Sequence, residues 1–175
     1  PTQGTIMING VNIGKLKDSK VPLLRRNIGV VFQDFKLLPT LTVYENVAFA
    51  LEVIEEQPKN IKKRVMEVLD LVNLKHKARM LPTELSGGEQ QRVSIARSIV
   101  NSPKVMIADE PTGNLDPETS WDIMNLFDEI NNRGTTIVMA THNKDIVNTM
   151  RHRVIAIEGG QIIRDEQRGE YGYES

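Results

Sequence analysis

The sequence contains no cysteine, few aromatic residues and no long apolar run. Without cysteine the chain forms no disulfide bond and offers no thiolate ligand to a metal ion. Its most apolar stretch, residues 43–54, is short and carries Glu45 and Glu52, so it cannot span a bilayer. These absences fit a protein of the reducing cytoplasm.

Size and charge set further limits. The chain has 175 residues, of which 39% are hydrophobic, and this is enough to bury one sizeable core. Its formal net charge is only -1, with 22 basic against 23 acidic residues. We therefore expect no nucleic acid among its partners, because a nucleic-acid-binding surface needs an excess of positive charge.

Apolar runs of strand type alternate with stretches of helical spacing along most of the chain. This alternation predicts an α/β fold, with a mostly parallel sheet covered by helices on both faces. Residues 42–100 break the alternation with tandem helices, which we expect to form a helical lobe between core segments 1–41 and 101–166. Residues 167–175 are predicted to be a polar, loose tail. The predicted strands are residues 5–8, 11–13, 28–32, 105–108, 136–140, 154–157 and 161–164, and the predicted helices are residues 42–53, 61–72, 86–100, 116–131 and 144–150.

Three helix starts carry capping signals. Thr42 with Glu45, and Ser86 with Glu89, have the spacing of capping boxes. Asp116 is a good N-cap, and the proline that follows it suits the first helical position.

The strongest chemical signal is an apolar run that ends in two carboxylates, Asp109 and Glu110. The carboxyl ends of parallel strands are where α/β sheets bind ligands. Adjacent strand residues point in opposite directions, so one acid can reach a metal ion while the other orients water. The alternative is a strand that runs into a solvated acidic turn.

The segment Leu85-Ser86-Gly87-Gly88-Glu89-Gln90 places two glycines at a predicted helix start. Free backbone N–H groups and the helix dipole make such a start attractive to anions, and glycines allow a phosphate to approach closely. An ordinary N-cap needs only Ser86 and Glu89. Because glycines weaken a helix start, their presence suggests a ligand or a partner surface.

Two further polar residues follow predicted strands. Gln33 comes directly after residues 28–32, and its side chain can offer a carbonyl oxygen to a metal ion and an amide to water. His142 follows residues 136–140, where it could meet a terminal phosphate or hold an attacking water. Taken alone, each is as easily a structural residue.

Taken together and in order, these segments resemble the ATP-binding subunit of ABC transporters. The resemblance implies a P-loop NTPase-like fold, ATP and Mg²⁺ as ligands, and ATP hydrolysis. In its terms the Q-loop residue is Gln33, the signature is residues 85–90, the Walker B strand is residues 105–109, the D-loop is residues 114–116 and the H-loop residue is His142. The segment from Asp109 to Asp116 looks like the branch that contains lipoprotein-release, macrolide-efflux and cell-division ATPases, and residues 31–38 and 168–173 look most like the cell-division members.

The same resemblance implies a role for each matching residue. The expected catalytic residues are Glu110, which would polarise the attacking water, and His142, which would contact the γ-phosphate. Mg²⁺ would be held by Gln33 directly and by Asp109 through water. In a homodimer, the nucleotide held by the other subunit would be bound by Ser86, Gly87, Gly88, Gln90 and Asp116. The partner would be a membrane permease, with the ATPase peripheral on the inner face of the cell membrane.

One family motif has no match in these residues. The phosphate-binding loop Gly-x-x-x-x-Gly-Lys-Ser/Thr does not occur, and the nearest string, Gly10 to Leu16, has one residue too few between its glycines and no hydroxyl for Mg²⁺. We expect the loop to precede Pro1 and the chain to be cut inside a domain. A non-catalytic module that docks on a membrane partner is the alternative, and a DNA-repair or translation ATPase is a third possibility, disfavoured because neither a long coiled-coil insertion nor a tandem copy is present.

Overall fold

The computed structural model describes residues 2–171 and divides the chain into two compact units, residues 1–140 and residues 141–175. Among the described residues, no helix combines the length and hydrophobicity needed to cross a membrane. The expected lobe and core boundaries, at residues 42 and 100, lie inside the first unit and stay a prediction. The strands of the first unit are β1 (Met7–Ile8), β2 (Val11–Asn12), β3 (Ile28–Val31), β4 (Val105–Asp109) and β5 (Thr136–Ala140), and its α-helices are α1 (Val21–Arg25), α2 (Val43–Glu52), α3 (Pro58–Leu71), α4 (Gly87–Ile99) and α5 (Pro117–Asn132).

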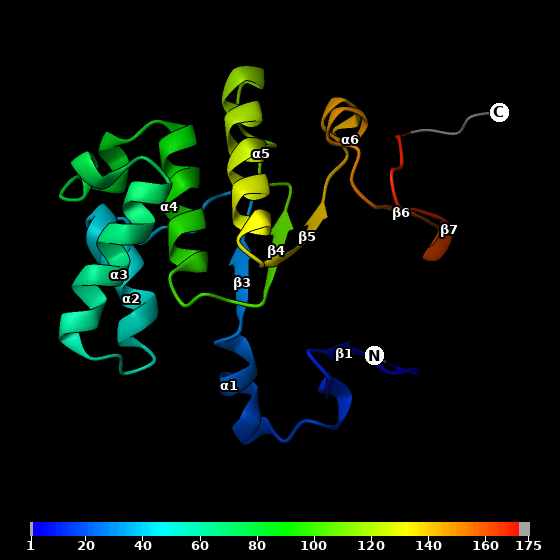
Figure 1. Cartoon of the computed structure of the whole chain (residues 1–175), viewed down its shortest axis with the longest axis horizontal. Helices are drawn as coiled ribbons and strands as arrows, with labels where there is room; N and C mark the ends of the chain where they lie inside the picture. The colour runs from blue at the N-terminus through cyan, green and yellow to red at the C-terminus, as the bar shows by residue number, and fades with distance from the viewer. Residues whose placement is uncertain (1, 172–175) are drawn as a thin grey trace. The chain divides into compact units, whose positions relative to one another are not determined.

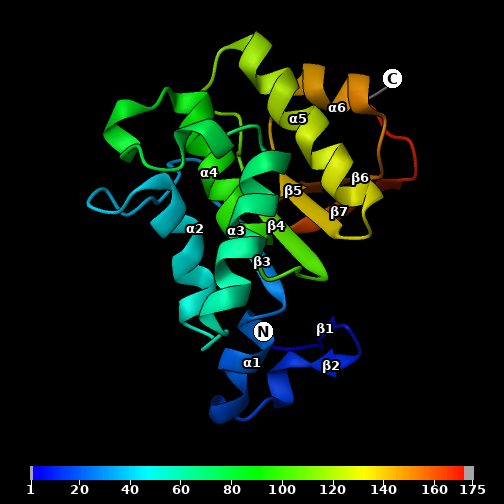
Figure 2. The same cartoon turned by 60° about the vertical axis from the view of Figure 1, so that its left-hand side comes forward.

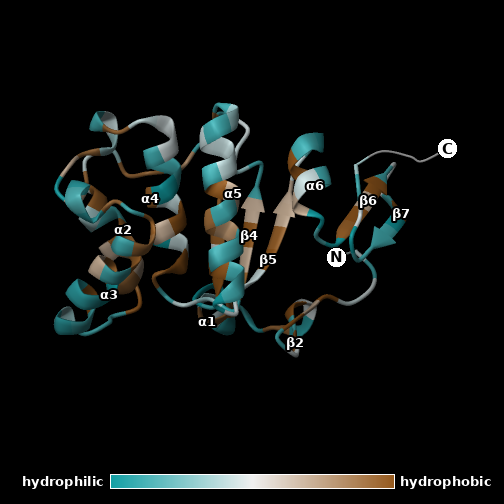
Figure 3. Ribbon diagram, turned by 45° about the horizontal axis from the view of Figure 1, so that its top comes forward, coloured by the Kyte–Doolittle hydropathy of each residue, from teal (hydrophilic) through white to brown (hydrophobic). Residues whose placement is uncertain are grey.

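A three-stranded parallel sheet, with β4 between β3 and β5, forms the centre of the first unit (Figure 1). Val31 pairs with Ala108, and Asp109 pairs with Ala140. The three strands therefore end at the same edge, as the sequence predicts. β4 and β5 are mainly apolar, whereas the helix α5 beside them alternates apolar and polar residues (Figure 3).

Helices cover one face of this sheet. Both connections, from β3 through α4 to β4 and from β4 through α5 to β5, step in the same direction, so right-handed crossovers place their helices on the same face (Figure 2). A row of paired residues on the opposite face, Val30, Ile107 and Val138, is 39%, 40% and 56% exposed. Our expectation of a sheet covered on both faces is therefore not met within this unit, because the strand order never reverses.

The helices α2, α3 and α4 pack into one cluster (Figure 2). Its interior is mainly aliphatic. On α2 the buried Asn46 accepts a hydrogen bond from the N–H of Leu38 and donates to the carbonyls of Leu38, Leu41 and Thr42. These bonds satisfy the amide and fix the loop that enters α2. The capping box of Thr42 and Glu45 forms as predicted.

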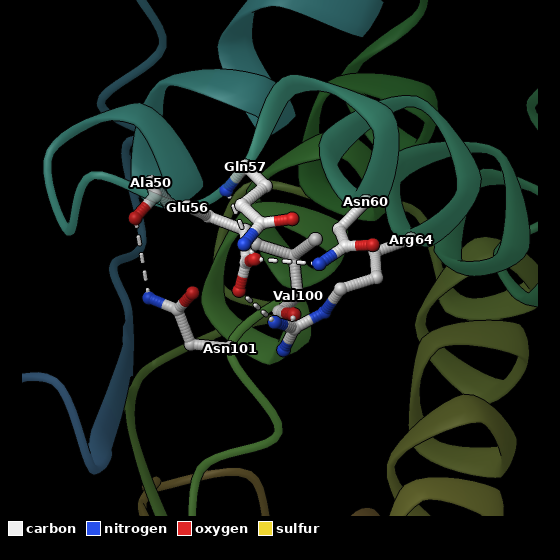
Figure 4. A network of polar contacts seen from close by, with 7 residues as sticks. All are labelled: Ala50, Glu56, Gln57, Asn60, Arg64, Val100 and Asn101. Carbon is white, nitrogen blue, oxygen red and sulfur yellow. Dashed lines mark hydrogen bonds and ion pairs between the residues drawn. The ribbon is translucent and has the colours of Figure 1, made fainter.

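Within this cluster, a polar network joins α3 to the end of α4 (Figure 4). Arg64 on α3 donates to Glu56 at 3.2 Å and to the carbonyl of Val100, the C-cap of α4, at 2.7 Å. Glu56 also accepts from Asn60 and from the N–H of Gln57. A cation is favourable at this end of a helix, so Arg64 both caps α4 and ties it to α3.

Residues 2–27 are more irregular than the sequence indicated. The predicted hairpin forms with an Asn9-Gly10 turn at positive φ, but each strand has only two residues. The five-residue helix α1 is absent from our prediction, because so short a segment shows no apolar period.

The second unit contains α6 (Lys144–Met150) and the antiparallel strands β6 (Val154–Glu158) and β7 (Gln161–Glu166), close to the predicted bounds. The segment after β7 is better held than expected as far as it is described. The N–H of Gly169 donates to the carbonyl of His152, and the N–H of Tyr171 donates to the side chain of Asn148. Residues 172–175 of the predicted tail lie outside the described residues.

Replacing Arg64 by Met should lower the thermal unfolding midpoint by about 5 °C, because the carbonyl of Val100 and the carboxylate of Glu56 both lose a charged donor. Differential scanning calorimetry measures the shift. The matched control is Lys63→Met on the same helix, whose side chain is 76% exposed and lies 4.0 Å from Glu67. Equal midpoints for the two variants would show that the network does not stabilise the fold.

Candidate functional site

The backbone at Glu110 departs from strand geometry directly after β4. Glu110 has a φ of 43°, which is unusual for a residue other than glycine. Its N–H donates to the carbonyl of Ala140 at 2.9 Å, and its carbonyl accepts from the N–H of Gly113 at 3.0 Å. The turn therefore holds Glu110 in a conformation that costs free energy, a cost often found at functional sites.

Gln33, which follows β3, lies against this turn. Its side-chain amide donates to Oδ1 of Asn114 at 3.2 Å, and Nδ2 of Asn114 donates back to the carbonyl of Gln33 at 3.2 Å. A Cβ atom at Gly113 would lie 2.9 Å from Nε2 of Gln33, so the glycine leaves room for that side chain. The structure thus brings Gln33 together with the residues that follow Glu110.

The start of α4 has the predicted capping box. Oγ of Ser86 accepts from the N–H of Glu89 at 3.3 Å, and the Glu89 carboxylate accepts from the N–H of Ser86 at 3.0 Å. The Ser86 hydroxyl retains its proton for donation to an anion. Gln90 turns back and donates to the carbonyl of Leu85 at 3.3 Å.

The two glycines of this segment have different structural reasons. Gly88 is buried, and a Cβ atom there would lie 2.4 Å from Cγ2 of Thr119 on α5. A Cβ atom at Gly87, which is exposed, would make only an ordinary contact of 3.5 Å with Leu115. Close packing of α4 against α5 therefore explains why residue 88 is glycine, a cause that the sequence did not reveal. Packing does not explain why residue 87 is glycine.

Asp116 caps α5 beside this contact, as predicted. Its carboxylate accepts from the N–H of Thr119 at 2.9 Å. Hydrogen bonds from the side chain and the backbone of Thr119 hold the pKa of Asp116 below its usual value. Asp116 is therefore a carboxylate at neutral pH, at the helix end next to the start of α4.

Glu89 is held in its charged form. The ammonium group of Lys77 forms an ion pair with its carboxylate. This bond, followed by the N–H of Ser86, lowers the pKa of Glu89. Because Lys77 balances the negative charge of Glu89, this carboxylate adds little repulsion to an anion that approaches the start of α4.

Two residues of α4 that the sequence analysis did not select reach into the site. The amide of Gln91 donates to the carbonyl of Pro111 at 2.5 Å and to the carbonyl of Phe32 at 3.4 Å. The guanidinium of Arg97 donates to the carbonyls of Phe35 and Lys36, two residues with positive φ in the loop after Gln33. The sequence could have indicated Gln91, because it lies four residues before Ile95 and therefore on the same, apolar face of the helix, where an amide is unusual.

Asp109 is exposed at the end of β4, one position before Glu110. With the side-chain carbonyl of Gln33 it offers oxygen atoms only, which is the donor type that Mg²⁺ prefers. No group of three or more acidic, histidine or cysteine side chains within residues 2–171 is arranged to hold a metal ion. The donor set therefore fits an ion that takes few protein ligands and completes its shell with water and phosphate, as Mg²⁺ does.

His142 is exposed between β5 and α6, and it belongs to the second unit. The next residue, Asn143, caps α6 by accepting from the N–H groups of Asp145 and Ile146. The role of His142 stays a prediction.

Comparison with known proteins gives a consistent result. The family model described as "ABC transporter" matches residues 1–113. The cell division ATP-binding protein FtsE of Bacillus subtilis is 73% identical over 172 residues, which are 98% of this chain and 75% of that protein.

Two solved structures have the same fold. The ATP-binding cassette MJ0796, a dimer in a post-hydrolysis state bound to ADP and Pi, has a TM-score of 0.82 and 35% identity over 98% of this chain and 76% of its own. CbiO1 from Clostridium perfringens, part of the ABC transporter complex cbiONQ, has a TM-score of 0.88 and 33% identity over 96% of this chain and 67% of its own. The expected P-loop NTPase-like fold is thereby confirmed.

Replacing Gly88 by Ala should lower the unfolding midpoint by roughly 3 to 8 °C, because the new methyl group overlaps Thr119. The second substitution Thr119→Ser removes Cγ2 and should restore most of the loss. Gly87→Ala is the control and should leave the midpoint nearly unchanged. If Thr119→Ser fails to rescue Gly88→Ala, the packing explanation for Gly88 is wrong.

Replacing Lys77 by Met should raise the pKa of Glu89 toward the ordinary glutamate value of about 4.3. Because the folded-state pKa is lowered, the stabilisation from this carboxylate is complete above the ordinary value and is lost as the pH falls through the lowered one. An NMR titration of the side-chain carboxyl carbon measures the change. Lys75→Met, which removes an exposed pair with Asp70, should leave the pKa of Glu89 where it was, and an unchanged value in Lys77→Met would contradict the assignment.

Proposed function

This chain belongs to the ABC transporter family, whose ATP-binding subunits hydrolyse ATP, and from that premise we propose that it supplies the catalytic and signature elements of a bacterial cell-division ATPase. The observation that carries the proposal is the strained turn at Glu110, fixed between Ala140 and Gly113 at the end of the central strand β4. The identity to the Bacillus subtilis protein supports the cell-division assignment. A lipoprotein-release or macrolide-efflux ATPase is the alternative within the same branch.

Glu110 would act as the group that orients and polarises the attacking water. A carboxylate can accept a proton from water only if its position is fixed relative to the phosphate. Hydrogen bonds at three backbone positions around Glu110 fix the backbone that carries this carboxylate, which supports the proposed role. His142 would donate to the γ-phosphate.

Gln33 and Asp109 would hold Mg²⁺, which when bound neutralises charge on the transferred phosphate. The side-chain NH₂ group of Gln33 donates to Asn114. Because this bond fixes the plane of the amide, it also orients the side-chain carbonyl of Gln33. Asp109, exposed at the strand end, would reach the ion through water.

The start of α4 would act on the nucleotide held by a second copy of the chain. Ser86, Gly87 and Gly88 offer a hydroxyl and first-turn N–H groups for a γ-phosphate, with Gln90 beside them. Asp116 would connect the two sites across the homodimer. ATP would favour the closed dimer because only that state contacts the phosphate from both sides.

The partner we propose is a membrane protein of the FtsX type, reached from the inner face of the membrane. Phe49 on α2 and Val53, the C-cap of that helix, lie one helical turn apart and are 45% and 61% exposed. Large apolar side chains exposed side by side are suited to a partner surface. This face lies in the predicted helical lobe.

The 175 residues alone should show no ATPase activity, since they contain no phosphate-binding loop. Joining them to the residues that precede the matching region in the Bacillus subtilis relative should produce activity. In that fusion protein, Glu110→Gln should lower kcat by about 100-fold or more, whereas the control Glu118→Gln, an exposed glutamate of α5, should not. A phosphate-release assay with saturating MgATP measures each rate.

Two outcomes would contradict the proposal. Hydrolysis by the 175-residue chain that Glu110→Gln abolishes would show that the phosphate-binding loop is not required. An active fusion protein in which Glu110→Gln leaves kcat unchanged would refute the catalytic role of Glu110.

A further inference from the structure

Gln91 is a polar side chain in the middle of a packed region. It lies on α4 between the signature segment and the aliphatic stripe of that helix, and its side chain is fully buried. Its Oε1 atom is also buried and has no hydrogen-bond partner among residues 2–171. An amide with an orphaned oxygen stabilises a core less than an apolar side chain of the same shape, so stability alone does not account for glutamine here.

The hydrogen bonds that Gln91 does make connect the two strand ends of the site. Nε2 donates to the carbonyl of Pro111, the residue after Glu110, and to the carbonyl of Phe32, the residue before Gln33. These two carbonyls are 79 residues apart in the sequence and belong to different strand ends. A single amide group thus fixes the backbone next to both functional side chains.

The other bonds of the Glu110 turn do not replace this contact. The N–H of Glu110 is held by β5, and its carbonyl is held by Gly113 within the turn itself. The bond from Gln91 to the carbonyl of Pro111 ties the turn to α4. Because α4 begins at the signature segment, any shift of that helix is passed to Glu110 and Gln33 together.

We propose that Gln91 is a positioning residue, which couples the signature helix to Glu110 and Gln33 through the carbonyls of Pro111 and Phe32. The inference rests on the proposed function of Glu110 and Gln33. It predicts that loss of the amide impairs the chemical step, while leaving the binding of ATP and the fold largely intact.

The test replaces Gln91 by Met, which is also unbranched and of similar length but has no donor. In the active fusion protein described above, kcat should fall by about 10- to 100-fold, because a small displacement of a catalytic group slows a reaction strongly. KM for ATP should change by less than about twofold, since ground-state contacts are kept. Gln91→Asn, which keeps an amide but is one methylene too short to reach both carbonyls, should show the same division between kcat and KM.

A second readout uses the 175-residue chain itself. Amide hydrogen exchange at Glu110 and Gly113 should become about 10-fold faster in Gln91→Met, while exchange at Met106 in the middle of β4 stays as in the unmodified chain. The matched control is Ser94→Ala, which removes another buried polar group of α4 whose hydroxyl has no partner in the described part of the chain. It should leave both kcat and the local exchange rates unchanged.

An unchanged kcat in Gln91→Met, or faster exchange spread evenly along β4, would overturn the proposal. An inactive unmodified fusion protein would instead refute the proposed function, and the exchange rates at Glu110 and Gly113 would still decide whether Gln91 fixes the turn. Should Gln91→Met fail to fold, Gln91→Asn provides the same decision.

Discussion

The parallel pairing of β4 with β3 on one side and β5 on the other is the constraint on which the rest of the site depends. The register that pairs Val31 with Ala108 and Asp109 with Ala140 brings three loops to one edge of the sheet. The left-handed backbone of Glu110 is held in part by its N–H, which donates to the carbonyl of Ala140. A change of register by one residue would move the side chain of Asp109 to the helix-covered face of the sheet. It would also leave the N–H of Glu110 without this acceptor.

The helix α4 converts this edge into a site with two components. Its first turn carries the signature segment, and its contact with α5 at Gly88 keeps that turn beside the cap at Asp116. Its buried Gln91 reaches back to the strand ends. The helix α4 would therefore contact a nucleotide at its first turn and, through Gln91, the strand end that holds a water molecule.

The sequence predicted the main strands, the longer helices and three helix caps, because these depend on local spacing and on residues within one turn. It also selected Glu110 and Gln33 from their place after apolar runs. What it missed depends on contacts between distant segments. The partner of Gln33 is Asn114, 81 positions away, and Gly88 is required by Thr119 on another helix. The uncovered sheet face follows from the handedness of two crossovers, which no single segment encodes.

The central claim is that a nucleotide is held with its terminal phosphate at this edge of the sheet. The most direct measurement is a crystal structure of the fusion protein carrying Glu110→Gln, grown with ATP and Mg²⁺. We predict that the side-chain carbonyl of Gln33 lies about 2.1 Å from the ion, with residue 110 hydrogen-bonded to a water molecule in line with the terminal phosphate. A nucleotide whose terminal phosphate is remote from both residues, with Gln33 still bonded only to Asn114, would contradict it.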